Sequence, residues 1–256
     1  MSKKTILILG GTTEANNLAE FLAKDPHFDI ITSRAGVTTK RKPVFGQERI
    51  GGFGGIEGLK EYLKKNQISA VIDATHPFAE TMTAHAFKGC QDLYLPHIIL
   101  NRSEWLETPV DNWIKVPNIE TALDHIRNIK LPLHIFLTTG QKELQNFTAI
   151  SQHHYVARMI ETPDINPLPD NLKIRFERGP FSLKNEIKLL RNHSINMIVS
   201  KNSGGEATAA KLKAARICNI PVLMISRPAL PPSSIVQSLG KVHDWLTSLN
   251  MTKPNR

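Results

Sequence analysis

Short apolar runs alternate with helix-patterned segments along almost the whole chain, and this alternation limits the fold more than any other feature of the sequence. The first part of the chain has runs that predict strands near 5–9, 28–32, 48–50, 70–74 and 97–101. Segments with helical spacing of apolar residues lie between them near 13–24, 56–66 and 78–90. Alternating strands and helices predict an α/β fold with mainly parallel sheets that helices cover on both faces.

The same alternation starts again in the second part of the chain. Strands are predicted at "WIKV", "HIFLTT", "HYVARMI", "NMIVSK" and "PVLMIS", and helices near 118–129, 183–193, 206–217 and 234–249. The segment "RSEWLETPVDN" at 102–112 shows neither period and is the predicted linker. We therefore expect two Rossmann-like lobes with a cleft between them, the first over residues 1–104 and the second over residues 105–256.

Composition is that of an ordinary globular protein, with 256 residues of which 41% are hydrophobic and 21% charged. No apolar run reaches the roughly 18 residues of a membrane helix, and the first residues do not form a secretory signal, so a cytoplasmic protein without a membrane span is expected. Cys90 and Cys218 lack metal-ligand spacing, so we expect buried reduced thiols and no metal site.

The net charge of +9 indicates a polyanionic ligand, an anionic partner or simply a basic exterior, and composition alone leaves the three open. The densest basic run, "TTKRKP" at 38–43, has no interleaved aromatic residues and is predicted to be a solvated loop. Nucleic-acid binding is therefore not expected.

The turn in "ILILGGTTEANNLAEFL", residues 6–22, carries the first candidate site. In parallel sheets, ligands bind beyond the carboxyl ends of the strands, and Gly10, Gly11, Thr12 and Glu14 follow the first strand directly. Glycine lets the backbone approach a phosphate, and the helix that follows presents its positive end. The pattern is not GxGxxG, so a plain tight turn capped by Thr12 or Thr13 remains the alternative.

The second strand ends in "TSRAG" rather than in the acidic residue that an NAD site places there. Ser33 and Arg34 suit a 2′-phosphate, although Arg34 is also compatible with a solvated surface arginine. The absent acid argues against S-adenosylmethionine. "GGFGG" at 51–55 follows the third strand and predicts either a close approach to the backbone or a flexible loop in which Phe53 packs on the sheet edge.

The fourth strand leads into "DATHPFA", residues 73–79. Pro77 suits the first turn of a helix and Thr75 a helix cap, which would hold His76 at the mouth of the crevice. His76 and Asp73 are candidates for contact with substrate or for proton transfer, and a structural hydrogen-bonding role is the alternative.

The second half repeats this arrangement in "TTGQKEL" at 138–144 and "SKNSGGEATAAKL" at 200–212. Lys201, Ser203 and Gly204 lead into an alanine-rich segment, which predicts a second helix start that accepts an anion. A plain helix cap beside a solvated lysine is the alternative.

With these residues in place, the chain resembles the precorrin-6A reductases of cobalamin biosynthesis, including the cobalt-precorrin-6A reductases. The resemblance is carried by "ILGGTTEANNLA", "SRAG", "RIGGFGGIEGL", "VIDATHPFAETMTAHA", "LNRSEW", "TTGQ" and "SKNSGGEATAAKLKAARICNIPVLMISRP", which span nearly the whole chain in order. "DATHPFA" together with the SKNSGG segment and a following "RP" is the most specific part. Asn202 stands where many relatives are expected to have aspartate.

The resemblance implies an NADPH-dependent enzyme that reduces one double bond of precorrin-6A, or its cobalt form, to precorrin-6B. The substrate is an anionic tetrapyrrole, which fits the basic chain, and other cobalamin-pathway enzymes are candidate partners. The resemblance implies that the cofactor is bound by Gly10, Gly11, Thr12, Glu14, Ser33, Arg34, Thr139 and Gly140. It implies that the substrate is bound by Thr75, Pro77, Phe78, Ser203 and Gly204. The implied catalytic residues are His76 and Lys201. The first lobe would be the NADPH-binding lobe, and the second would complete the substrate cleft.

Other interpretations stay open at this point. The chain could reduce a different conjugated substrate with NADPH, or bind NADP without catalysis. The sequence leaves undecided whether the substrate carries cobalt, which face of the nicotinamide is used and what the oligomeric state is.

Overall fold

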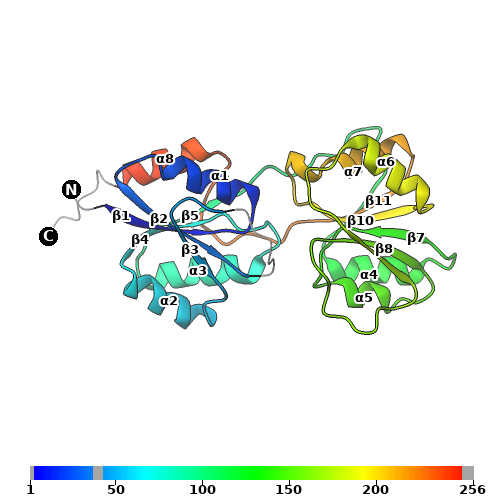
Figure 1. The fold of residues 1–256 in the computed structure, drawn as a ribbon, viewed down its shortest axis with the longest axis horizontal. Coiled ribbons are helices and arrows are strands. Elements are labelled where there is room, and N and C mark those ends of the chain that lie inside the picture. Colours follow the sequence, from blue (N-terminus) through cyan, green and yellow to red (C-terminus); the bar gives the residue numbers. More distant parts are fainter. Residues whose placement is uncertain (1–2, 37–42, 250–256) are drawn as a thin grey trace. The chain divides into compact units, whose positions relative to one another are not determined.

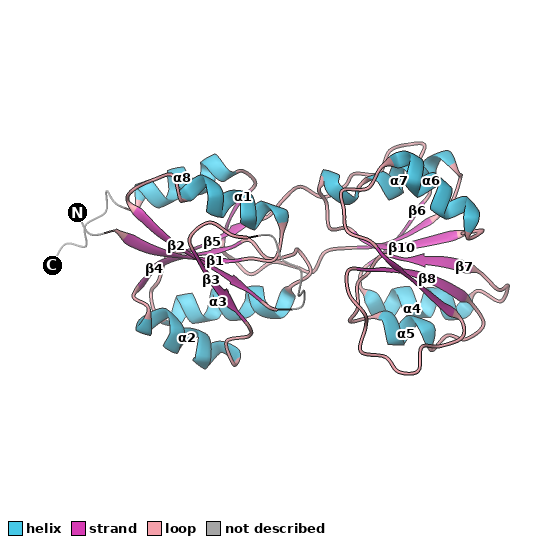
Figure 2. Cartoon of the chain, viewed as in Figure 1, coloured by secondary structure: helices cyan, strands magenta, loops and turns pink. Residues whose placement is uncertain are grey.

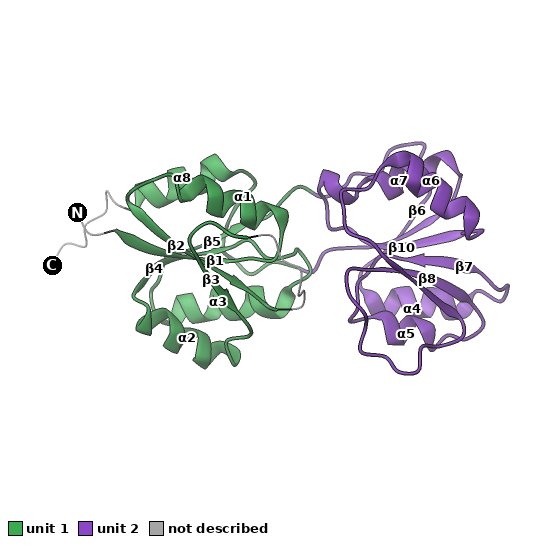
Figure 3. Ribbon diagram, viewed as in Figure 1, with its two compact units in different colours: residues 1–103, 229–256 green, residues 104–228 purple. Residues whose placement is uncertain are grey.

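A computed structural model describes residues 3–36 and 43–249. The chain forms two compact units, unit 1 with residues 1–103 and 229–256 and unit 2 with residues 104–228 (Figure 3). Each unit contains one six-stranded sheet, and every strand pair in the described part of the chain is parallel. The predicted fold class is confirmed. Most of the basic run at 38–43 lies outside the described residues.

Unit 1 is a doubly wound sheet with two helices on each face (Figures 1 and 2). Its strands are β1 (Lys4–Leu9), β2 (Phe28–Arg34), β3 (Gln47–Ile50), β4 (Ile68–Asp73), β5 (His97–Leu100) and β12 (Ser234–Val236). Its helices are α1 (Thr13–Leu22), α2 (Gly55–Lys65), α3 (Glu80–Asp92) and α8 (Leu239–Ser248). The strand order is β12-β5-β4-β1-β2-β3.

The unbroken apolar run of β1 reflects burial on both faces of the sheet. Ile6 and Ile8 belong to the core cluster that includes α1 and α8 residues, whereas Leu7 and Leu9 belong to the cluster that includes α2 and α3 residues. Successive side chains of a strand point to opposite faces, so a strand covered on both sides needs apolar residues at every position.

Unit 2 repeats the architecture with its own set of elements. Its strands are β6 (Trp113–Val116), β7 (His134–Leu137), β8 (His154–Met159), β9 (Leu172–Phe176), β10 (Met197–Lys201) and β11 (Val222–Ile225). Its helices are α4 (Ile119–Asn128), α5 (Leu144–Thr148), α6 (Leu183–Asn192), the 3₁₀ turn η1 (Glu206–Thr208) and α7 (Ala210–Ile217). The strand order is β6-β11-β10-β7-β8-β9, with α6 and α7 on one face and α4 and α5 on the other (Figure 1).

In both sheets the chain reverses its winding direction between two central strands. The reversal lies between β1 and β4 in unit 1 and between β7 and β10 in unit 2, because the strands that follow in the chain extend the sheet to opposite sides. Such switch points leave a crevice beyond the strand ends where ligands of open α/β sheets bind.

The sixth place in each sheet is filled by a strand that is remote in the chain. β12 lies beside β5 in unit 1, and β6, which precedes the other strands of unit 2, lies beside β11. The predicted second lobe of 105–256 is therefore corrected, since residues 229–256 belong to unit 1.

The predicted helix at 234–249 is also wrong over its first part. Ser234–Val236 is β12, Ser238 caps the next helix by accepting a hydrogen bond from Lys241 N, and α8 starts at Leu239. A strand of three residues is too short to show an alternating pattern.

The remaining predicted strands and helices are confirmed to within a few residues at each end. The sequence prediction missed β9, which follows the proline-rich loop, and α5, which has five residues. Both are too short or too polar for a clear period.

We expect Leu246→Ala to lower the free energy of unfolding by about 2–5 kcal/mol, because this α8 side chain is 1% exposed in the core cluster that contains Leu18 and Leu22. Urea unfolding followed by circular dichroism measures the change. Leu131→Ala, at a leucine that is 76% exposed, is the control and should change stability by less than about 0.5 kcal/mol. Equal small losses would contradict the place of α8 in the core of unit 1.

Candidate functional site

Hydrogen bonds join the loops that follow β1, β2 and β4. Gly10 N–H donates to Ser33 O at 2.8 Å, and Thr12 Oγ1 donates to Ala74 O at 2.7 Å. The three loops that carry the unit 1 candidates therefore form one cluster at the switch point.

The glycine turn leaves the backbone before α1 open to a ligand. A Cβ on Gly10 would lie 3.0 Å from Thr32 Cγ2, so a larger residue would require the Thr32 side chain to shift. Gly11 has φ +110°, a conformation that L side chains rarely adopt, and no atom lies within 4 Å of its Cβ direction. This open backbone, next to the positive end of a ten-residue helix, is suited to an anion.

Thr12 and Glu14 hold this turn in place. Thr12 Oγ1 accepts a hydrogen bond from Ala15 N at 3.1 Å while it donates to Ala74 O, so its hydroxyl caps α1 and fixes the turn. Glu14 forms an ion pair of 2.8 Å with Arg102, which neutralises a carboxylate in the first turn of the helix. Of the two caps named in the alternative of a plain tight turn, Thr12 is the residue that caps α1.

Arg34 is not a solvated surface arginine, and that alternative is wrong. Its side chain is 9% exposed, Nη1 lies 3.1 Å from Glu48 Oε1, and Nη2 donates to Asn16 Oδ1 at 2.7 Å. Ser33 is also buried, and its Oγ accepts a hydrogen bond from Arg49 Nη1 at 3.2 Å. The end of β2 thus carries a buried arginine beside a second, partly exposed one.

Arg49 is the residue of this region that the sequence prediction missed. Its guanidinium lies 3.7 Å from the ring centroid of Phe53 and 5.0 Å from that of Tyr62, and it donates to the carbonyls of Gly51 and Gly52. Phe53 therefore packs beneath a cation. Arg49 stands next to the last residue of a predicted strand and just before "GGFGG". That position at a strand end is the sequence feature that could have identified it.

Asp73 organises the loop after β4. It is 1% exposed, Oδ1 accepts from Thr75 N and Thr75 Oγ1 at 3.0 and 2.6 Å, and Oδ2 accepts from Thr83 Oγ1 at 2.6 Å. Thr75 consequently does not cap a helix, and Pro77 does not lie in the first helical turn, since α3 starts at Glu80. Both local predictions are corrected.

His76 is exposed at this loop and is fixed by a neighbouring amide. Its Nδ1 accepts a hydrogen bond from Phe78 N–H at 3.2 Å, and the two rings lie 5.9 Å apart. An Nδ1 that accepts a hydrogen bond carries no proton, so the neutral ring has its proton on Nε2. His76 is therefore a donor through Nε2.

Thr138 joins the switch-point strands of unit 2. Its N–H and Oγ1 both donate to Val199 O at 3.0 Å, which ties the end of β7 to β10. Thr139 is 6% exposed, and its Oγ1 makes no hydrogen bond within the described residues. Gly140 follows with φ +93° and no atom near its Cβ direction, so this turn is also open.

Lys201 is held by an ion pair that the sequence analysis did not anticipate. Its Nζ lies 2.8 Å from Glu143 Oε1, and the two side chains are only 14% and 16% exposed. The alternative of a solvated lysine is therefore wrong. Glu143 stands within "TTGQKEL", but nothing local in the sequence indicates that it faces Lys201.

Asn202 anchors the segment at the start of unit 2 that precedes β6. Its Nδ2 donates to Glu104 Oε2 and Trp105 O at 3.1 and 3.2 Å, and its Oδ1 accepts from Trp105 N at 2.9 Å. An aspartate cannot make the two donated bonds, so asparagine here has a structural role.

Ser203 and Gly204 do not open a long helix directly. Ser203 O accepts from Arg227 Nη2 at 3.2 Å, Gly204 has φ +67°, and the 3₁₀ turn η1 separates them from α7. The predicted anion-accepting helix start at this point is corrected to a turn.

The sequence-predicted residues thus fall into two groups, one at each switch point. The group in unit 1 is Gly10, Gly11, Thr12, Glu14, Ser33, Arg34, Thr75, His76, Pro77 and Phe78. The group in unit 2 is Thr139, Gly140, Lys201, Ser203 and Gly204.

Neither the cysteines nor the potential metal ligands of the described chain add a reactive group to this site. Both cysteines are free; burial, with the charge of Asp73, raises the pKa of Cys90 to about 12, and Cys218 is half-buried. Over residues 3–36 and 43–249 there is no cluster of three or more potential metal ligands among histidine, cysteine, aspartate and glutamate. No helix in the same ranges has both the length and the apolar character to cross a bilayer.

Comparison with known proteins gives full-length matches. The family model described as "Precorrin-6x reductase CbiJ/CobK" matches residues 5–247. The precorrin-6A reductase of Rhodobacter capsulatus is 40% identical over 96% of this chain and 97% of its own length, and that of Mycobacterium tuberculosis is 42% identical over 95% and 98%. A solved structure described as "CobK precorrin-6A reductase" matches with a TM-score of 0.89 and 39% identity over 96% of both chains.

We expect Asp73→Ala to destabilise unit 1 by about 2–4 kcal/mol, because it leaves the Thr75 and Thr83 donors without their acceptor. Asp73→Asn should recover most of this loss, since the amide oxygen accepts from Thr75 and the amide nitrogen donates to a rotated Thr83 hydroxyl. Thermal unfolding of both variants measures the difference. An equal loss for both would mean that the charge, and not the hydrogen bonding, stabilises the loop.

Proposed function

The chain belongs to the precorrin-6x reductase CbiJ/CobK family, and from this premise we propose that it reduces one double bond of precorrin-6A to give precorrin-6B in cobalamin biosynthesis, with NADPH as the reductant. It is then an oxidoreductase that acts on a CH–CH bond. The structural observation that supports the proposal most is the position of the predicted residues at the switch points of two doubly wound sheets.

The residues of unit 1 fit a dinucleotide. The open backbone at Gly10 and Gly11, before the start of α1, is suited to the pyrophosphate. The ion pair between Arg102 and Glu14 removes a negative charge that would oppose it. Bound NADPH would supply the hydride, and the protein has to position two ring systems and exclude water.

We attribute a preference for NADPH over NADH to residues at the carboxyl ends of β2 and β3. Ser33, Arg34 and Arg49 place a hydroxyl and two guanidinium groups where an NAD site has an acid. Because Glu48 and Asn16 already hold Arg34, we assign direct contact with the 2′-phosphate to the more exposed Arg49, and support of that site to Arg34.

The substrate is an anionic tetrapyrrole, and the basic chain favours its approach. A net charge of +9 raises the encounter rate with a polycarboxylate, and arginine and lysine side chains bind carboxylates directly. We assign substrate contacts to the loops with Thr75, Pro77 and Phe78 and with Ser203 and Gly204.

The reduction also needs a proton on a neighbouring carbon. The ammonium of Lys201, next to the Glu143 carboxylate, can give up a proton and is the proposed donor. Donation by His76 as an imidazolium would require its Nδ1 to give up the hydrogen bond from Phe78 N–H. We therefore assign His76 the role of orienting the substrate through Nε2–H.

Anaerobic incubation of the protein with precorrin-6A tests the function. We expect the near-ultraviolet absorbance of NADPH to fall and the tetrapyrrole to gain the mass of two hydrogens. A parallel incubation with cobalt-precorrin-6A decides which form is preferred. A protein that binds NADPH but oxidises none with either substrate would be a binding module, and the proposal would be wrong.

We expect Arg49→Ala to raise the KM for NADPH with a loss of roughly 1–3 kcal/mol of binding and to leave the KM for NADH nearly unchanged, because only NADPH carries the 2′-phosphate. Arg127→Ala, which removes an exposed arginine of α4 paired with Asp124, controls for the change in net charge. Steady-state kinetics with both cofactors gives the result. An equal rise for the two cofactors would count against a 2′-phosphate contact.

We expect Lys201→Ala to lower kcat by about a hundredfold, the usual size of a lost proton-transfer group, with little change in the KM for NADPH. Glu143→Gln should have a smaller effect, because it leaves the amine in place but removes the charge that holds it. An unchanged kcat in Lys201→Ala would show that solvent supplies the proton.

A further inference from the structure

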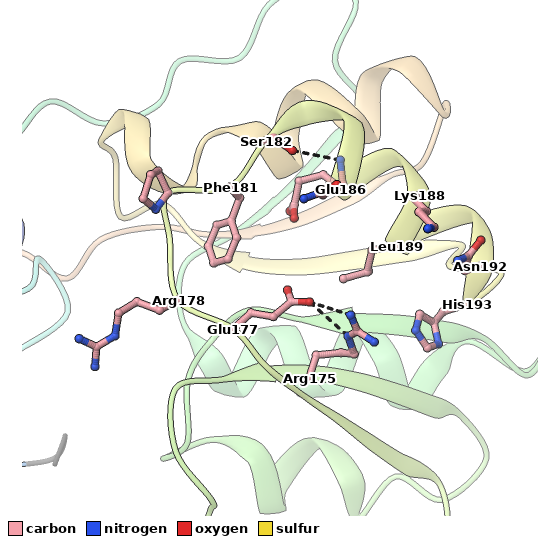
Figure 4. A pocket seen from close by; sticks show the side chains of 12 residues that line it. Arg175, Glu177, Arg178, Phe181, Ser182, Glu186, Lys188, Leu189, Asn192 and His193 are labelled. Carbon is pink, nitrogen blue, oxygen red and sulfur yellow. Dashed lines mark hydrogen bonds and ion pairs between the residues drawn. The ribbon is translucent and has the colours of Figure 1, made fainter. Parts of the chain in front are cut away.

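A basic pocket lies along α6 in unit 2, between that helix and the edge strand β9. Its volume is about 620 Å³. Figure 4 shows Phe181 and Leu189 facing the space, with Arg178 toward one end and His193 toward the other. No residue of this pocket belongs to the candidate site described above.

The acidic residues of the pocket are already neutralised. Glu186 is 2% exposed and accepts two hydrogen bonds from Arg158, at 2.6 and 3.1 Å. Glu177 accepts from Arg158 Nε at 3.1 Å and from Arg175 Nη2 at 2.9 Å. These carboxylates therefore leave little negative potential to oppose an anionic ligand.

The pocket also contains cations that no carboxylate neutralises. Within the described residues, neither Arg178 nor Lys188 makes a hydrogen bond or an ion pair. Burial lowers the pKa of His193, and the positive charges of Arg175 and Lys173 lower it further, which reflects the positive potential at that end. An uncompensated pair of cations on partly apolar walls favours a ligand with several carboxylates.

The cations are separated rather than gathered at one point. Lys188 follows the capping Ser182 by six residues, or roughly 9 Å along the helix, while Arg178 precedes that cap. A single phosphate would be held by converging donors, whereas spaced cations fit carboxylates on separate arms of one molecule.

One end of the pocket, at Arg178, lies at the same edge of the sheet as the candidate site of unit 2. All strands are parallel, so Arg178, just after β9, lies at the same edge as Lys201 at the end of β10. With β7 and β8 between them, the two strand ends are separated by three spacings, roughly 14 Å. A tetrapyrrole with its propionate arms extends over a comparable length.

We propose that this pocket binds acetate or propionate carboxylates of the tetrapyrrole substrate through Arg178 and Lys188, an inference that rests on the proposed function. The pocket is then a substrate-binding subsite, separate from the cofactor site of unit 1.

Two charge reversals with a matched control test the subsite. Arg178→Glu and Lys188→Glu each place a negative charge in the pocket, and Lys184→Glu makes the same change on α6 at an exposed residue that does not line it. The binding probe is uroporphyrin, a fluorescent tetrapyrrole with eight carboxylates, titrated into the protein without NADPH. The KM values for precorrin-6A and NADPH are measured in parallel.

We expect each pocket variant to weaken uroporphyrin binding and to raise the KM for precorrin-6A by about tenfold or more, with the KM for NADPH unchanged. Lys184→Glu should stay within about twofold of the unaltered protein, and Lys188→Arg should retain binding. An equal loss of uroporphyrin binding in Lys184→Glu would show that long-range charge alone causes the effect. A raised KM for NADPH in the pocket variants would indicate a phosphate site. Either result overturns the proposal, as does a lack of uroporphyrin binding by the unaltered protein.

Failure of the proposed function gives a different result. In that case precorrin-6A is not reduced by the unaltered protein, while uroporphyrin binding still depends on Arg178 and Lys188 and not on Lys184. That outcome would retain the pocket as a polycarboxylate site and reject the reaction.

Discussion

One threonine hydroxyl in each unit joins the two strands at which the sheet reverses its winding direction. Thr12 Oγ1 donates to Ala74 O in unit 1, and Thr138 Oγ1 donates to Val199 O in unit 2. Each bond joins residues that are about 60 positions apart in the chain. Each bond adds to the backbone pairing of the same two strands, and together they fix the chain at the start of the crevice beyond the strand ends.

Buried or half-buried ion pairs position the cations of both units. Glu48 holds Arg34, Glu143 holds Lys201, and Glu186 holds Arg158. A charge with restricted exposure is costly unless it is paired, so each carboxylate also fixes where its cation lies. Arg34 has such a carboxylate partner, whereas Arg178, which lines the α6 pocket, makes no ion pair within the described residues.

Five strands of each sheet have the same order, and the sixth is remote in the chain from the strand that it pairs with: β12 is the last strand of unit 1, whereas β6 is the first of unit 2. β12, which follows the whole of unit 2 in the sequence, extends the sheet of unit 1, and α8 covers the α1 face with Val242 and Leu246. The stability of unit 1 therefore depends on residues at the far end of the sequence, since the core of that face is incomplete without them.

The sequence by itself determined the α/β class, the position of most strands and helices, and the glycine-bearing turns that follow the strands. These features are local: apolar residues on both faces of β1 predict a covered parallel strand, and Gly11 predicts a backbone conformation that other residues avoid. Only the tertiary structure decided that β12 returns to unit 1, that Arg49 contacts Ser33 and that Glu143 pairs with Lys201. Such contacts join residues that share no local period, and they follow from how strands pair and helices pack.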